Sequence, residues 1–255
     1  MSHSLAEKRI LITREKAQAR KLIQLVRDTG AIPCVAPMIR FEPIPLTTTK
    51  KEYMELSKQQ WLFFTSANTV RFFNQDIKKL GIEVPHLIAS VGEKTTKALL
   101  NLGYKVDFQP SIFQGSVMVE EFVQRYGTSI NVTIVSGESA REEIPSLLTK
   151  YSVPFTQLKI YRTIENKESE RLLNSHLKTG IDICFFTSPS TVHACVQLAK
   201  NMYLNKLKET CLCIAIGETT ATSLLECGFK KVTYPKKYTM EEMVECAKKY
   251  VEEGV

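Results

Sequence analysis

Hydroxyl side chains follow directly after an apolar run at two places in the chain. Thr-Ser-Ala-Asn at 65–68 follows the run 61–64, and Thr-Ser-Pro-Ser at 187–190 follows the run 184–186. Each run is typical of a buried strand and each following segment of a helix, so hydroxyls and free backbone N–H groups gather where the helix begins. Such a turn favours anions, because the N-terminal end of a helix carries partial positive charge.

A second pair of turns has the pattern Gly-Glu-x-Thr. It occurs at 92–95 and 217–220, a separation of 125 positions (217 − 92), and each copy follows an apolar run. Three cations lie near strand ends and are candidate carboxylate partners: Arg14, Lys94 and Arg141. Any one turn is an ordinary helix cap, and any one cation a solvated surface charge. Four turns together indicate a site for a polyanion.

The elements that must hold these turns are repeated along the chain. Besides the two pairs of turns, residues 12–15 align with 135–138, and Met38 aligns with Tyr161, at an offset of 123 (161 − 38). Aligned blocks in the same order indicate a duplication of domain size. The repeat leaves open whether the two lobes are sequential or interleaved.

Strands alternate with helices in both halves, which predicts an α/β fold with parallel sheets. Strands are expected at 10–13, 32–35, 87–91 and 105–108, and three prolines in 37–45 predict an extended connector. Parallel sheets bind ligands outside the carboxyl ends of their strands, where the four turns lie. We expect a cleft if the two edges face each other.

The composition points the same way. The chain has 255 residues and a formal net charge of +7, which favours an acidic partner. Seven cysteines, several within apolar runs, are expected to be reduced and buried in a cytoplasmic protein. No apolar stretch is long enough to span a bilayer, so no membrane association is expected.

The sequence lacks the motifs of several functional classes. The chain has no dinucleotide fingerprint, phosphate-binding loop or nucleophile elbow. Cys211 and Cys213 do not have zinc-type spacing and lack a second ligand pair. We therefore expect no cofactor and no metal. The hypothesis of a nucleic-acid partner rests on charge alone, since the sequence has no cluster of basic and aromatic residues to support it.

The motifs taken together resemble the uroporphyrinogen-III synthase family. The resemblance extends from about 10 to about 247, and its matching segments are 10–14, 63–70, 91–95, 160–163, 185–190, 215–220 and 238–243. It implies two similar three-layer α/β lobes with parallel sheets, joined by a two-stranded β connector. One lobe is expected to hold 1–36 with 166–255, the other 46–155, and the connector strands 37–45 and 156–165.

The resemblance also implies an activity. Members of the family act without metal or coenzyme and convert hydroxymethylbilane, a linear tetrapyrrole with eight carboxylates, into uroporphyrinogen III by losing water and inverting the terminal pyrrole ring (D). A protein of this kind is expected to be a monomeric lyase of heme biosynthesis, with Tyr161 assisting the departure of the hydroxyl group. The residues expected to bind substrate are Thr13, Arg14, Ser66, Ala67, Thr95, Ser188, Pro189, Thr219 and Thr220, with Lys94, Gly137 and Arg141 as further candidates.

One alternative comes from another functional class. A two-lobe protein that closes on an anionic ligand without chemistry would show the same turns and the same lack of a conventional catalytic constellation. Production of isomer III from hydroxymethylbilane would separate the two hypotheses, because uncatalysed closure gives isomer I.

Overall fold

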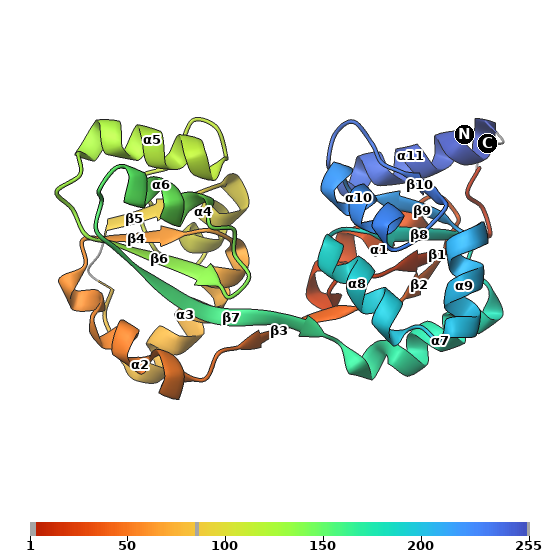
Figure 1. Ribbon diagram of the computed structural model, residues 1–255, viewed down its shortest axis with the longest axis horizontal. Coiled ribbons are helices and arrows are strands. Elements are labelled where there is room, and N and C mark those ends of the chain that lie inside the picture. The colour runs from red at the N-terminus through yellow and green to blue at the C-terminus, as the bar shows by residue number, and fades with distance from the viewer. Residues whose placement is uncertain (1–3, 85–86, 254–255) are drawn as a thin grey trace. The chain divides into compact units, whose positions relative to one another are not determined.

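The computed structural model describes residues 4–84 and 87–253 and shows an α/β protein (Figure 1). The chain divides into two compact units: unit 1 holds Met1–Arg40 with Ile164–Val255, and unit 2 holds Phe41–Thr163. Residues 1–3 and 254–255 of the expected first lobe and 85–86 of the second lie outside the described residues. The predicted fold class is confirmed.

Unit 1 is built on a five-stranded sheet. Its order is β10-β9-β8-β1-β2, and every neighbouring pair is parallel. The strands are β1 (Arg9–Ile12), β2 (Ile32–Val35), β8 (Ile183–Phe186), β9 (Leu212–Ala215) and β10 (Lys231–Thr233). The helices are α1 (Arg20–Arg27), α7 (Glu170–Thr179), α8 (Pro189–Leu198), α9 (Asn201–Thr210), α10 (Glu218–Glu226) and α11 (Met240–Glu253). Two 3-10 turns, Lys16–Gln18 and Lys167–Ser169, precede α1 and α7.

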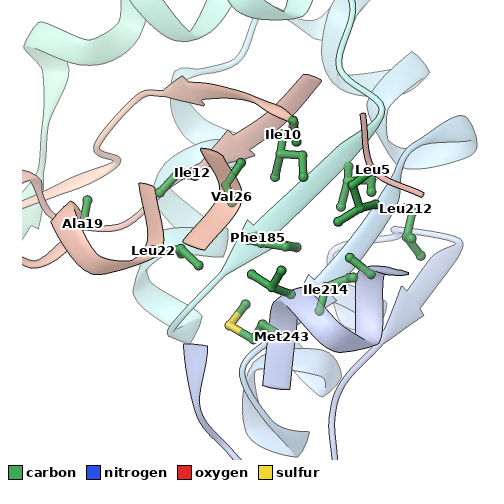
Figure 2. Packing of buried hydrophobic residues seen from close by; sticks show 14 residues of the cluster. Leu5, Ile10, Ile12, Ala19, Leu22, Val26, Phe185, Leu212, Ile214 and Met243 are labelled. Carbon is green, nitrogen blue, oxygen red and sulfur yellow. The ribbon is translucent and has the colours of Figure 1, made fainter. Parts of the chain in front are cut away.

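Alternation along the strands sends side chains to both faces of this sheet. Figure 2 shows one face, where Ile12, Phe185 and Ile214 pack against Leu22 of α1 and Met243 of α11. The intervening strand residues point to the other face, where α8 and α10 pack together (Figure 1). Because both faces are covered by helices, the central strands β8 and β9 are continuous apolar runs.

Unit 2 has a second five-stranded sheet in the order β3-β7-β6-β4-β5. The pairs β5 with β4, β4 with β6, and β6 with β7 are parallel. The strands are β3 (Ile39–Pro43), β4 (Trp61–Phe64), β5 (Leu87–Ser90), β6 (Val132–Gly137) and β7 (Phe155–Glu165). The helices are α2 (Leu46–Met54), α3 (Ala67–Leu80), α4 (Glu93–Leu100), α5 (Gly115–Tyr126) and α6 (Glu143–Lys150), with a 3-10 turn at Leu56–Lys58.

The four residues of β4 show how the sequence makes the two layers of the core in unit 2. Leu62 and Phe64 belong to the cluster formed with α2, α3 and α4, whereas Trp61 and Phe63 belong to the cluster formed with α5 and α6. All four side chains are at most 2% exposed. The run is therefore apolar throughout because helices bury both of its faces.

Four strands have the same order in the two sheets. In unit 1, β1 lies between β2 and β8, and β9 follows on the side of β8; in unit 2, β4 lies between β5 and β6, and β7 follows on the side of β6. The fifth place is taken by β10 in unit 1 and by β3, which precedes β4 in the chain, in unit 2. The direction of winding changes between β1 and β8, and between β4 and β6. In open parallel sheets, ligands bind at the carboxyl end of this switch point. The switch points lie between β1 and β8 in unit 1, and between β4 and β6 in unit 2.

The chain passes between the units twice, and both boundaries fall inside strands, β3 and β7. The prediction of a strand at 105–108 is wrong, because in this segment Phe108 makes an isolated parallel bridge with Ala89 and no strand forms. The carboxylate of Asp107 accepts the Ile88 N–H at 3.0 Å, a donor that a strand backbone would otherwise use. Among the described residues, no helix combines the length and apolar character needed to cross a lipid bilayer.

A buried carboxyl in unit 2 makes stability depend on pH. Asp76 of α3 is 2% exposed and accepts a hydrogen bond from the Tyr53 hydroxyl at 2.8 Å. Burial raises the pKa of Asp76, so the folded protein holds this proton more tightly than the unfolded chain does. The stability gained from the proton is complete below the ordinary carboxyl pKa of about 4 and is lost as pH rises through the folded pKa.

We therefore expect Asp76→Asn to gain stability relative to the wild type as pH rises from acid to neutral, measured by urea unfolding across pH. Asp107→Asn is the control with the opposite sign. Burial acts to raise the Asp107 pKa, but hydrogen bonds from Lys105 and the Ile88 N–H lower it overall. This variant should therefore lose stability relative to wild type as pH rises. Parallel pH curves for wild type and Asp76→Asn would contradict the assignment.

Candidate active site

The turn after β4 forms one wall of the candidate site in unit 2. Ser66 is the N-cap of α3: its backbone is extended, and its Oγ accepts the Thr69 N–H at 3.2 Å. The Thr69 hydroxyl accepts the Ser66 N–H in return, which completes a capping box. The cap holds the strand-to-helix turn in one geometry, and Ser66 itself stays half-buried at its edge. Ala67 is the first residue of α3.

The turn after β5 forms the neighbouring wall. Gly92 is the extended N-cap of α4, and Thr95 is only 4% exposed, with its N–H donated to the Gly92 carbonyl. Lys94 is exposed on the first turn. Glu93 lies on the lining of the site, but its carboxylate pairs with Lys97 at 2.7 Å. That hydrogen bond lowers the Glu93 pKa and offsets its charge.

Two adjoining hollows occupy this edge of the unit 2 sheet. The larger has a volume of about 530 Å³ and lies at the switch point, between the turns that follow β4 and β6. The smaller, of about 290 Å³, lies over the Gly92 turn, and both are bordered by Thr65, Val91 and Phe113. Of the residues predicted from the sequence, the larger hollow brings together Ser66, Gly137, Arg141 and Tyr161, and the smaller Lys94 and Thr95.

Tyr161 is held in the larger hollow by its packing. Its ring stacks on Phe72 at a centroid distance of 5.2 Å and meets Phe41 edge-on at 5.5 Å. On the remaining side it lies against Gly137, where a Cβ would be 2.7 Å from the tyrosine Cζ and 2.9 Å from its hydroxyl oxygen. The phenol therefore occupies a defined place at the switch point, and only glycine at 137 leaves room for it.

Unit 1 carries the corresponding turns on its own sheet. Ser188 caps α8 and accepts the Thr191 N–H at 3.4 Å, and Pro189 fills the first helical position. Gly217 is the N-cap of α10, with Thr219 exposed and Thr220 3% exposed on the first turn. Because α10 is a helix, its first N–H groups have no partners within it.

Two further predicted residues lie at the unit 1 switch point. Thr13 is fully buried and donates its hydroxyl to the Phe185 carbonyl at 2.8 Å, so this side chain fastens β1 to β8. Arg14 donates from Nη2 to Gln18 at 2.9 Å, while its Nε is buried with no hydrogen-bond partner among the described residues. Burial lowers the pKa of the Arg14 guanidinium. An anion at this turn would supply the missing acceptor.

Two aromatic residues belong to these sites and were not predicted. Phe113, 54% exposed, covers the Gly92 turn, where a Cβ on Gly92 would lie 3.7 Å from it. Tyr238, 58% exposed, covers the Gly217 turn, where a Cβ would lie 3.0 Å from three of its ring atoms. The two aromatics are 125 positions apart (238 − 113), the same offset as the two glycines. This shared offset is the feature of the sequence from which the two aromatic residues could have been predicted.

The arrangement can bind anions and flat apolar groups together. Hydroxyls, first-turn N–H groups and cations suit carboxylates, while the exposed aromatic faces suit planar rings. Of metal-ligating groups, the described residues hold one set of three, the buried cysteines 184, 211 and 213 in unit 1. They lie away from the turns, toward the other end of the strands, so they are no part of this site.

Comparison with known proteins gives a consistent set of similarities. A family model described as "Uroporphyrinogen-III synthase HemD" matches residues 20–245. The chain is 28% identical to "Porphyrin biosynthesis protein HemD" of Ruminiclostridium josui over 96% of its own length, and it spans about half (49%) of that relative. It is 25% identical to "Uroporphyrinogen-III synthase" of Chlorobaculum parvum, covering 90% of this chain and 93% of that one.

Solved structures show the same fold. A mutant uroporphyrinogen III synthase from the extremely thermophilic bacterium Thermus thermophilus matches with a TM-score of 0.64 and 17% identity, over 96% of this chain and 99% of that one. The uroporphyrinogen-III synthetase of Helicobacter pylori matches with a TM-score of 0.64 and 18% identity, over 94% and 98%.

Proposed function

Because this chain belongs to the uroporphyrinogen-III synthase family, we propose that it cyclises hydroxymethylbilane with loss of water and inversion of ring D, giving uroporphyrinogen III. The single observation that carries the proposal is the larger hollow of unit 2. There the switch point of the sheet gathers Ser66, Arg141 and Tyr161, three residues that the motifs had singled out from distant parts of the chain.

Binding is expected to depend on many small contributions. The substrate carries eight carboxylates, and the turns offer hydroxyls and first-turn N–H groups in both units, with Lys94 and Arg141 exposed beside them in unit 2. Arg14, whose Nε has no hydrogen-bond partner within the part of the chain that the structure describes, is the corresponding cation of unit 1. Holding a flexible chain in one curled geometry removes the entropy barrier to closure, which is the larger part of the proposed catalysis.

The chemical step needs a group that helps the hydroxyl leave. Electrons of the pyrrole nitrogen expel the hydroxyl oxygen, which departs as water once it has gained a proton, and a positive charge stays on the bilane. The Tyr161 phenol is the candidate donor, because packing on Phe72 and Phe41 fixes its position in the hollow. The substituted carbon of ring D then attacks to form a spiro intermediate, which fragments and closes again with the ring inverted. Loss of a proton from the ring D carbon that forms the last bond removes the positive charge and leaves the neutral product.

The exposed aromatics are expected to bind pyrrole rings. Phe113 borders both hollows of unit 2, and Tyr238 occupies the corresponding place in unit 1. We predict that Phe113→Ala raises KM about threefold to tenfold while kcat changes little, since a ring contact is worth about 1 kcal/mol and makes no bond to the reacting atoms. Steady-state kinetics would measure it.

Met54→Ala is the matched control, because Met54 is 60% exposed on α2 and borders neither hollow. It should leave KM unchanged. A KM equal to that of wild type in Phe113→Ala would remove the aromatic residue from the proposed site, while leaving the rest of the proposal standing.

The proposed function is tested by incubating the purified chain with hydroxymethylbilane, oxidising the products and separating uroporphyrin isomers III and I. Isomer III is expected, formed faster than spontaneous closure. Isomer I alone, at the spontaneous rate, would overturn the assignment. Stoichiometric binding of the bilane without isomer III would instead identify a non-catalytic binding protein.

The cellular setting is part of the same proposal. We propose a cytoplasmic enzyme that acts as a monomer on this small molecule, without a nucleic-acid partner. All seven cysteines are free thiols, which supports a reducing compartment. The positive charge is accounted for by a polycarboxylate substrate, so nothing in the composition calls for nucleic acid.

A further inference from the structure

Three cysteine sulfurs converge inside unit 1. The Sγ atoms of Cys184, Cys211 and Cys213 all lie within 4.8 Å of one another. Cys184 and Cys213 are fully buried, and Cys211 is 3% exposed. Single buried cysteines in a sheet serve as small apolar residues, and Cys34 of β2 is one of these. Three that meet at one point form a set of soft ligands.

The strand register explains why they meet. Cys184 of β8 pairs with Cys213 of β9, so the two side chains stand side by side on the same face of the sheet. Cys211 lies two residues before Cys213 and returns to the same face. Its Sγ is 3.5 Å from that of Cys184. The cluster is therefore fixed by backbone pairing and not by a mobile loop.

Backbone carbonyl oxygens of Asp182 and Leu212 lie 3.4 and 3.6 Å from Cys211 Sγ. Thiol donors of Cys184 and Cys213 stabilise negative charge on Cys211 and lower its pKa to about 5, while burial raises the pKa of the Cys184 thiol. The other charged or titratable groups that act on Cys211 are Asp182, Lys231 and Cys195. The three cysteines are at most 3% exposed.

We propose that the sulfur atoms of Cys184, Cys211 and Cys213 bind a soft monovalent metal ion, copper(I) in particular. The proposal concerns the protein itself and does not depend on the proposed enzyme activity. The thiols lie near the amino ends of β8 and β9, whereas the Ser188 and Gly217 turns follow the carboxyl ends of the same strands.

The geometry fits a three-coordinate ion. A metal bonded to three sulfurs at about 2.3 Å holds them about 4 Å apart, close to the spacing already present. Zinc in structural sites takes four ligands, and among the described residues the group of closely placed ligands stops at three. Thiolates are the ligands that select copper(I) over hard cations such as magnesium or calcium.

Each cysteine binds the ion as a thiolate and releases its proton to solvent. The ion has a short way in, because Cys211 Sγ lies 3.4 Å from the carbonyl of Asp182, an exposed residue.

The test uses the full chain, reduced and kept anaerobic, with copper(I) supplied in competition with a chromogenic chelator. We expect one copper ion to stay with each chain, and an equal amount of zinc(II) not to displace it. Cys213→Ala should weaken retention by about tenfold or more, because a ligand is lost. Cys34→Ala, which removes a buried cysteine of the same sheet outside the cluster, should retain copper as the wild type does.

Several results would overturn the proposal. In the first, the wild type releases copper as readily as Cys213→Ala does. In the second, Cys34→Ala loses as much copper as Cys213→Ala. In the third, zinc(II) displaces the bound copper. If Cys213→Ala fails to fold, X-ray absorption of the copper-loaded wild type decides. Three sulfurs at about 2.3 Å are expected. A shell containing nitrogen or oxygen would show that the ion binds elsewhere.

Discussion

Gly137→Ala is expected to lower kcat/KM for conversion of hydroxymethylbilane by about a hundredfold, because displacing a reacting group by about 1 Å has effects of that size. A Cβ at this position would lie 2.7 Å from Cζ of Tyr161 and 2.9 Å from its hydroxyl oxygen. Neither distance is tolerable for carbon, so the ring must move. It cannot move freely, since Phe72 and Phe41 pack against it.

The fold should survive this change. Gly137 is not among the glycines with a left-handed backbone, so alanine can adopt its conformation without strain. The measurements are steady-state kinetics and thermal unfolding of the same preparations. A fall in activity with a melting temperature near that of wild type would place the effect in the site.

A second variant shows whether glycine acts through the tyrosine. In a Tyr161→Ala background there is no ring to displace, so adding Gly137→Ala should reduce activity little further. The two changes would then be strongly non-additive, as expected for residues in contact. Additive losses, or wild-type activity in Gly137→Ala, would contradict the proposed role.

The sequence predicted local features well where chemistry and structure coincide at one turn. Ser66 and Ser188 were interpreted as helix caps or anion donors from hydroxyls placed after apolar runs, and both caps are confirmed. Glycine before the Glu-x-Thr turns is the N-cap of α4 and of α10. These features depend on a few adjacent residues, which is why a single sequence shows them.

Features that depend on strand order were beyond prediction. The hollow exists because β4 and β6 are neighbours, although the chain forms β5 between them. Nothing in residues 61–64 or 132–137 specifies that pairing. The cysteine cluster has the same origin: Cys184 and Cys213 are 29 positions apart (213 − 184), and only the parallel register joins them.

Phe113 shows a different limit of prediction from sequence. It lies in an irregular segment, where apolar residues have no period to reveal which way they face. Its partner in the repeat is Tyr238, an aromatic of different chemistry, so the two segments align only through the glycines that they cover. Exposure of a large aromatic beside a conformationally fixed turn became visible only with the fold.

Tyr161→Phe tests the chemistry most directly, and we expect kcat to fall about tenfold to a hundredfold while KM stays near that of wild type. We take about a hundredfold, the lower limit of general-acid effects, as the upper limit here, because the pyrrole nitrogen electrons already help to expel the hydroxyl. Phenylalanine preserves the stacking on Phe72 and the edge contact with Phe41, so binding and stability should persist. Only the hydroxyl is removed.

Tyr104→Phe is the matched control: its hydroxyl donates to Asn74 at 3.3 Å, and it borders neither hollow. Its kcat should equal that of wild type. A normal kcat in Tyr161→Phe, combined with a large loss in Gly137→Ala, would mean that the ring matters as a wall and not as a proton donor. The departing hydroxyl would then take its proton from another group, and Tyr161 would position the bilane by shape alone.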